Sequence, residues 1–242
     1  MDRPPASPGS APDAAQDAAS YRRGERRVLI LASSLGFVLF AALFLCLPSV
    51  GPIFRLFDIP AASMLPALRV GSHIVVSRAS YGYSRHSFNL LELPIEGRWP
   101  NIMPQRGDVV VFRLPRDRQT FFVKRIVGLP GDRIQMISGR LSINGQLVAR
   151  ERAPRLPDPS GKAGEVDVYV ERLPEGMAYQ IIETNGDTGH FDNTAVFAVP
   201  PGHLFVLGDN RDNSTDSRVQ STRYGVGYIP IELVLGRVIA TF

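Results

Sequence analysis

Short runs of β-branched and aromatic residues, each bounded by Gly, Pro, Asn or Asp, follow one another through the chain after residue 70. This punctuation is typical of β-strands. Asn144-Gly145, between two such runs, is a strong signal for a two-residue hairpin turn. Because no long amphipathic helical pattern accompanies them, we expect a mainly β fold built on an antiparallel sheet or barrel. The predicted strands are residues 72–77, 108–114, 120–127, 133–137, 141–143, 146–149, 166–171, 178–183, 204–207 and 235–240.

One long uncharged segment precedes these strands. Residues 28–47 contain no charged side chain and are long enough to cross a bilayer as a helix. Four arginines lie between residues 22 and 27, whereas Arg55 is the only nearby basic residue on the other side. The positive-inside rule therefore predicts an N-terminus in the cytoplasm and everything after Pro48 outside. Because a cleavable signal peptide has a shorter apolar region, we expect an uncleaved anchor.

Composition divides the chain further. The N-terminal stretch is rich in Ala, Pro, Asp and Ser, and it has too few apolar residues to form a core, so we expect it to be disordered. Residues 138–200 are interpreted as a β-ribbon insertion, in which the Pro- and charge-rich stretch 150–164 is predicted to be an exposed loop. Residues 79–105 are interpreted as a second insertion. The predicted parts are a cytoplasmic tail at 1–27, an anchor at 28–48 and an extracytoplasmic domain at 49–242.

The charged and metal-binding residue types exclude several functions. The formal net charge is only +4, and the arginines are scattered rather than clustered with aromatic residues, so we expect no nucleic-acid partner. The single cysteine, Cys46, excludes an intramolecular disulfide. The four histidines form no i, i+4 pair and have no cysteine partner, which argues against a zinc site. We therefore expect no metal and no cofactor.

Lys124 is unusual because it interrupts the apolar run 121–127, which ends at the turn signal 128–131. On a strand, its neighbours on the same face are Phe122 and Ile126. Burial among them would disfavour the ammonium and lower the pKa of Lys124. A neutral amine at neutral pH could act as a general base. The alternative is that Lys124 lies on an edge strand and extends into water, covering apolar surface with its stem.

Two further segments contain candidate polar groups. Ser63 lies between small residues in the Pro-framed loop 58–66, although a serine in such a loop is on its own an ordinary turn residue. Residues 208–218 are dense in Asp, Asn and Ser. They do not fit a calcium-binding loop, because Ser214 replaces the sixth-position Gly and Gln220 the twelfth-position Glu. Local hydrogen bonds are the more plausible role of these side chains.

Together and in this order after an apolar anchor, these segments resemble bacterial type I signal peptidases (leader peptidases). The likeness covers the chain from about Asp58 to the C-terminus and is carried by residues 59–68, 106–112, 124–134 and 208–218. It implies the signal-peptidase type of β fold. It also implies a membrane-anchored serine endopeptidase that removes N-terminal signal peptides from exported preproteins after small residues (Ala-x-Ala).

The resemblance implies a serine–lysine dyad. Ser63 would be the nucleophile that forms an acyl-enzyme, Lys124 the general base, and Ser214 the residue that orients the lysine. The backbone N–H of Ser63 would donate to the oxyanion. Ala61 departs from the family pattern, because many members carry Ser or Gly at this position and the Ser hydroxyl is a second oxyanion donor.

The resemblance also implies residues around the dyad. Arg125 with Asp209, and Asp216 with Arg218, would form structural ion pairs. The apolar positions of the substrate pocket would admit only small side chains, although some of them are also expected as ordinary core residues. The implied pocket residues are Phe57, Ile59, Met64, Leu68, Phe122 and Val123.

The implied location is the cytoplasmic (inner) membrane of a bacterium, as a single-pass monomer with its catalytic domain on the periplasmic side. Its partners would be secretory preproteins and the lipid bilayer. Two alternatives remain: a specialised pilin or conjugation-substrate leader peptidase with the same dyad, and a non-catalytic periplasmic scaffold on the same fold. A Ser-His-Asp triad is disfavoured because no histidine lies in the matching segments.

Overall fold

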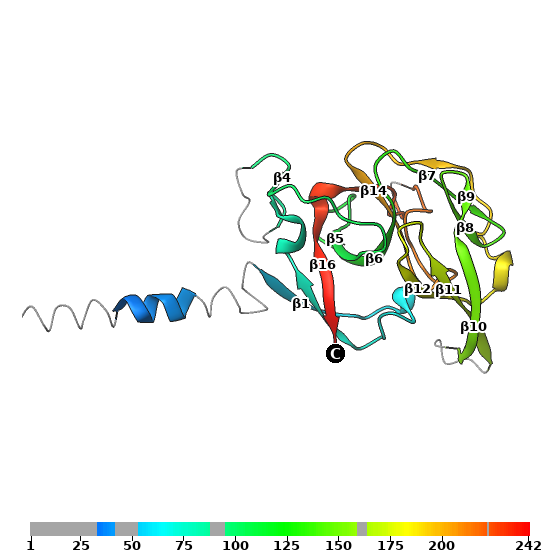
Figure 1. Cartoon of the computed structure of the whole chain (residues 1–242), viewed down its shortest axis with the longest axis horizontal. Helices are drawn as coiled ribbons and strands as arrows, with labels where there is room; N and C mark the ends of the chain where they lie inside the picture. The colour runs from blue at the N-terminus through cyan, green and yellow to red at the C-terminus, as the bar shows by residue number, and fades with distance from the viewer. Residues whose placement is uncertain (1–32, 42–52, 88–94, 159–163, 222) are drawn as a thin grey trace, which may run out of the picture. The chain divides into compact units, whose positions relative to one another are not determined.

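The computed structural model describes residues 33–41, 53–87, 95–158, 164–221 and 223–242 (Figure 1). The chain divides into two compact units, Met1–Cys46 and Leu47–Phe242. In the first unit, residues 33–41 are helical. Within the described ranges, no helix combines the length and the apolar character that a membrane crossing requires. The predicted tail and most of the predicted anchor lie outside the described residues, and the predicted domain boundaries stay predictions.

The second unit consists of short strands joined by turns and short 3₁₀ helices, so the prediction of a mainly β, antiparallel fold is confirmed. In the described part of this unit, the 3₁₀ helices are η1 (Ala62–Met64), η2 (Ala79–Tyr81), η3 (Gly186–Thr188) and η4 (Ile231–Leu233). The strands are β1 (Phe54–Asp58), β2 (His73–Ser77), β3 (Tyr83–Ser84), β4 (Arg98–Trp99), β5 (Val109–Arg113), β6 (Phe121–Gly128), β7 (Arg133–Ile137), β8 (Arg140–Ile143), β9 (Gln146–Leu147), β10 (Ala149–Pro157), β11 (Glu165–Arg172), β12 (Ala178–Glu183), β13 (Phe197–Ala198), β14 (His203–Leu207), β15 (Ile229–Pro230) and β16 (Val234–Thr241).

A seven-stranded sheet forms the centre of this unit, with the order β1-β2-β16-β5-β6-β14-β15. The C-terminal strand β16 lies between β2 and β5 (Figure 1). Side chains alternate across this sheet, so Val110 and Phe112 of β5 belong to one core cluster and Val111 to another. Apolar residues therefore pack on both faces, which explains the near-continuous β-branched and aromatic runs of the inner strands.

The sequence interpretation of residues 150–164 as an exposed loop is wrong for most of that stretch. β10 is a strand that pairs with β11, with a register irregularity between Ala153 and Leu156. It is an edge strand of the three-stranded sheet β10-β11-β12, where proline and charge are tolerated because one side of the strand needs no hydrogen-bond partner. Residues 159–163 lie outside the described part of the chain.

Candidate active site

Ser63 lies in η1, between Pro60 and the core. Its neighbour Met64 is fully buried, which fixes this short helix against the sheet. The loop after β14 holds the same helix from the other side. There the Asn210 backbone N–H donates to the Ser63 carbonyl oxygen at 3.1 Å, and Asn210 Nδ2 donates to the Ala62 carbonyl oxygen at 3.2 Å. Asn210, a residue distant in sequence, therefore holds the backbone of η1 through two hydrogen bonds.

Lys124 comes from β6 and reaches the Ser63 hydroxyl. Its Nζ lies 2.7 Å from Ser63 Oγ and 2.8 Å from the carbonyl oxygen of Val123. The Lys124 side chain is only 3% exposed, so the alternative of a lysine that extends into water is excluded. A hydroxyl in hydrogen-bond contact with a buried amine is the arrangement that general-base activation requires.

Burial lowers the pKa of Lys124 from 10.5 to about 8, although the charges of Asp216 and Asp209 oppose this change. Both acids are themselves occupied by arginines. Asp209 accepts hydrogen bonds from Arg125 Nε at 2.8 Å and Arg125 Nη2 at 2.7 Å, and Asp216 accepts two from Arg218, both at 2.9 Å. The two ion pairs implied by the resemblance are thus present, and in each of them an arginine offsets part of the carboxylate charge that favours the lysine ammonium.

Ser214 lies close to this pair of residues but is not a hydrogen-bond partner of Lys124. Its Oγ is buried and interacts with the Asp216 carboxylate. It packs on Gly208, where an added Cβ would lie 2.2 Å from Ser214 Oγ and 2.5 Å from the Ser63 carbonyl oxygen. Gly208 thus allows the two serine segments to approach each other. The lysine-orienting role of Ser214 stays a prediction.

A cavity of about 440 Å³ opens beside Ser63 and Lys124. Three of the predicted pocket residues, Ile59, Phe122 and Val123, line it, and so does Ala61. Three polar residues that sequence reasoning did not select also line it. One comes from the turn before β6, and the other two come from the loop after β14, inside the matching segment 208–218, which is the signal that could have indicated them. They are Thr120, Asn213 and Thr215.

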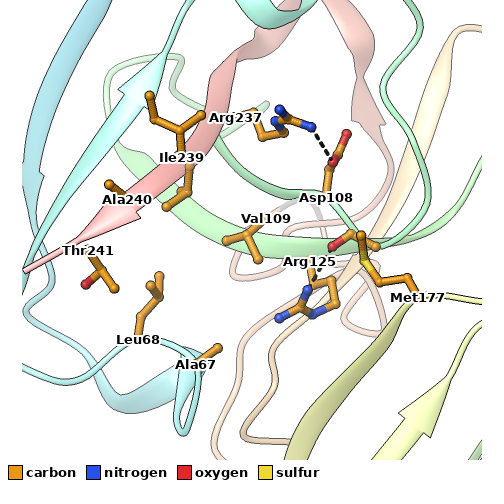
Figure 2. A pocket seen from close by; sticks show the side chains of 12 residues that line it. Ala67, Leu68, Asp108, Val109, Arg125, Met177, Arg237, Ile239, Ala240 and Thr241 are labelled. Carbon is orange, nitrogen blue, oxygen red and sulfur yellow. Dashed lines mark hydrogen bonds and ion pairs between the residues drawn. The ribbon is translucent and has the colours of Figure 1, made fainter.

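The other three predicted pocket residues do not line this cavity. Met64 is fully buried in the core, and Phe57 packs edge-on against Phe121 with ring centroids 5.2 Å apart. Leu68 lines a different cavity of about 450 Å³, on the side of β6 to which Arg125 points (Figure 2). Phe57, Met64 and Leu68 therefore pack in or against the core cluster beneath η1.

The second cavity is distinct from the one beside the dyad. Figure 2 shows Leu68 on one side of it and Met177 on the other, with Arg237 Nη1 placed 3.5 Å from Asp108 Oδ1. Neighbouring residues on a strand point in opposite directions, so Lys124 reaches one cavity and Arg125 the other. Ser63 and Lys124 are not among the residues that line the second cavity.

Within the described residues, one group of carboxylates is arranged so that it could hold a metal ion, formed by Glu183, Asp192 and Asp212. None of the three lines the cavity beside Ser63. The polar side chains that line this cavity are the hydroxyls of Ser63, Thr120 and Thr215, the amine of Lys124 and the carboxamide of Asn213.

The chain is similar to known peptidases. The family model "Signal peptidase, peptidase S26" matches residues 31–242. A signal peptidase I of Rickettsia typhi is 36% identical over 188 residues, which cover 75% of this chain and 69% of the relative. A signal peptidase I of Pseudomonas aeruginosa is 36% identical over 191 residues, covering 77% of this chain and 63% of the relative.

A solved structure also matches, that of a signal peptidase I from Enterococcus faecalis V583. It is 26% identical, covers 57% of this chain and 98% of that chain, and has a TM-score of 0.33. This score is too low to support an argument about the fold.

Proposed function

The chain belongs to the signal peptidase family, peptidase S26, and we propose that it is a membrane-anchored serine endopeptidase that cleaves N-terminal signal peptides from exported preproteins. Ser63 is the nucleophile and Lys124 the general base. The observation that carries this proposal is the 2.7 Å contact between Lys124 Nζ and Ser63 Oγ at a buried position.

The lowered pKa of Lys124 determines what fraction of its amine is neutral and can act as the base. With a pKa of about 8, roughly one tenth of Lys124 is neutral at pH 7. This is on the order of 300-fold more neutral amine than a lysine with the ordinary value of 10.5 would supply. The amine accepts the Ser63 proton as Oγ bonds to the scissile carbonyl carbon. The resulting ammonium then protonates the leaving amine, which completes the acyl-enzyme. Lys124 next deprotonates a water molecule whose oxygen attacks the ester, and Ser63 regains its proton.

The oxyanion of each tetrahedral intermediate needs donors. The backbone N–H of Ser63 supplies one in this proposal. Ala61 lines the cavity and has no hydroxyl to supply another. Loss of one such donor costs on the order of 3 kcal/mol in other enzymes, so the enzyme is either slower than relatives with a Ser at this position or has another group as the second donor.

The cavity walls support a preference for small residues near the cut. Ile59, Phe122 and Val123 restrict the volume next to the dyad, so a large side chain there would overlap them. β14 pairs with β6 only from Arg125 onward. The edge of β6 that carries Lys124 can therefore receive an extended substrate segment as an added strand. This combination favours Ala-x-Ala sites.

The apolar segment 28–47 supports a position in the cytoplasmic membrane, with the catalytic unit on its periplasmic side. Signal peptides are themselves apolar segments in the bilayer. A tethered enzyme meets them at a raised effective concentration. We propose that the enzyme acts as a monomer on secretory preproteins, without a cofactor.

Cleavage of a preprotein in detergent by the full chain tests this function. We expect Ser63→Ala and Lys124→Ala to abolish processing, whereas Ser72→Ala, at an exposed turn, and Lys162→Ala, at the chain's other lysine, retain it. Processing by either dyad variant would refute the mechanism.

Ala61 favours a second candidate, a peptidase specialised for one pilin or conjugation substrate, and cleavage of several unrelated preproteins would exclude it.

A further inference from the structure

Three acidic side chains from separate segments meet on the far side of the loop that follows β14. Glu183 is the last residue of β12, Asp192 follows η3, and Asp212 lies two residues before Ser214. One carboxylate oxygen of each lies within 4.8 Å of the others. Glu183 and Asp192 are buried.

Three arginines lie near this cluster, yet each of them forms an ion pair with a carboxylate outside it. Among the described residues, none of the three acids forms an ion pair. The neighbouring guanidinium groups pair instead with other carboxylates: Arg211 with Glu171, Arg150 with Asp187, and Arg218 with Asp216. The cluster therefore concentrates negative charge that its surroundings do not neutralise.

Glu183 is the member of this cluster whose carboxylate lacks hydrogen-bond partners. Its side chain is 1% accessible, and neither carboxylate oxygen has a hydrogen-bond partner among the described residues. Burial raises the pKa of this carboxyl to about 9, because Arg211 offsets the effect only in part and Asp212 and Asp192 add to it. An unpartnered buried carboxylate is costly, so the position requires either a bound cation or a proton.

We propose that Glu183, Asp192 and Asp212 form a binding site for a hard divalent cation, with Ca²⁺ as the best fit. Ca²⁺ binds carboxylate oxygens at about 2.4 Å in irregular geometry, so opposite ligands lie about 4.8 Å apart. The second oxygens of the two aspartates are already held in place. Asp212 Oδ2 accepts from the backbone N–H groups of Thr184 and Asn185, and Asp192 Oδ2 accepts from that of Gly189. Such outer contacts orient ligands toward a metal.

A cation here would tie the loop after β14 to the end of β12. That loop already pairs with β12, because Ile182 N–H donates to the Asp209 carbonyl at 2.9 Å and Arg211 N–H to the Ile182 carbonyl at 3.0 Å. Between these two residues, the Asn210 backbone N–H donates to the Ser63 carbonyl oxygen at 3.1 Å. The ion would thus stabilise the segment that positions Ser63 and Ser214, without touching substrate. This site does not depend on the proposed peptidase activity.

Calcium binding to the full chain in detergent tests the site without any substrate. After chelator treatment, the protein is titrated with Ca²⁺ by calorimetry, and its thermal unfolding is followed with and without about 1 mM Ca²⁺. We expect one saturable site. The Tm should rise by about 5 °C or more when Ca²⁺ exceeds its Kd about 100-fold.

Glu183→Gln and Asp212→Asn keep the side-chain shape and should both lose the binding heat and the Tm rise. Glu151→Gln, at an exposed position of β10, is the matched control and should retain both. Absence of saturable binding in the chelator-treated protein would overturn the proposal and assign a proton to Glu183 instead. Equal binding by the unmodified chain and Glu183→Gln would also overturn it, because the ion would then lie elsewhere.

Discussion

Gly208 and Ser214 are in direct contact across the loop that follows β14: a methyl group on Gly208 would lie 2.2 Å from Ser214 Oγ. The same methyl group would lie 2.5 Å from the carbonyl oxygen of Ser63. One glycine therefore sets the spacing between the predicted nucleophile and the residue predicted to orient its base. Any residue with a Cβ at this position would overlap both serine segments, so the close approach requires a glycine.

Gly208→Ala should separate these two segments. We expect it to destabilise the fold by about 1–3 kcal/mol, as overpacking of a well-filled interior does. We also expect it to lower kcat/KM at least tenfold, because the Ser63 backbone must move. Urea unfolding and preprotein cleavage measure the two effects. Wild-type activity in this variant would show that the spacing between Ser63 and Ser214 is not critical.

The pH dependence of cleavage should report Lys124. Because the neutral amine is the base, kcat/KM should rise with pH through about 8, the lowered pKa of this side chain. Measurement of kcat/KM on a signal-peptide substrate from pH 6 to 10 checks this expectation. A rising limb near the ordinary lysine value of 10.5 would contradict the neutral-base mechanism.

The same pKa predicts a stability effect. Burial lowers the pKa of Lys124 from 10.5 to about 8, so the unfolded chain binds the proton more tightly than the folded chain does. Below pH 8, this difference in pKa lowers the free energy of unfolding by its full amount, about 3 kcal/mol. Stability recovers as the pH rises toward 10.5, because the unfolded lysine then also loses its proton.

Lys124→Met should therefore be more stable than the wild type at pH 7, by about 1–3 kcal/mol after the lost hydrogen bonds are counted. The advantage should shrink between pH 8 and 10.5. Denaturant unfolding of both proteins across this pH range tests it. A variant less stable than the wild type at pH 7 would mean that Lys124 is not held in a desolvated site.

Ala61→Ser should add a hydroxyl to the cavity wall beside Ser63. If the oxyanion lacks a donor, kcat should rise, by up to about 100-fold, since one donor contributes on the order of 3 kcal/mol. Ala62→Ser, which also adds a hydroxyl to a residue lining the cavity, is the control and should not accelerate cleavage. An unchanged kcat in Ala61→Ser would indicate that another group already supplies the second donor.

The local pattern of residue types was enough to predict most strands of the central sheet. The run around Lys124 and the run that became β14 were both recognisable, because alternation and β-branched content depend only on residues adjacent in the chain. β10 was missed for the same reason: its charged and proline residues resemble a loop, and only pairing with β11 makes them a strand. β1 was not anticipated either, although it pairs in register with β2.

The pattern of residue types was sufficient to predict that this chain forms short antiparallel strands and that one of them carries a lysine among apolar residues. The burial of Lys124 and its contact with Ser63, a residue 61 positions away, depend on how the strands pack in the folded chain. The approach of Glu183 to Asp192 and Asp212, which come from two other segments, depends on the folded chain as well. Strand propensity is a property of neighbouring residues, whereas burial, contact distance and a shifted pKa arise from segments that only the folded chain brings together.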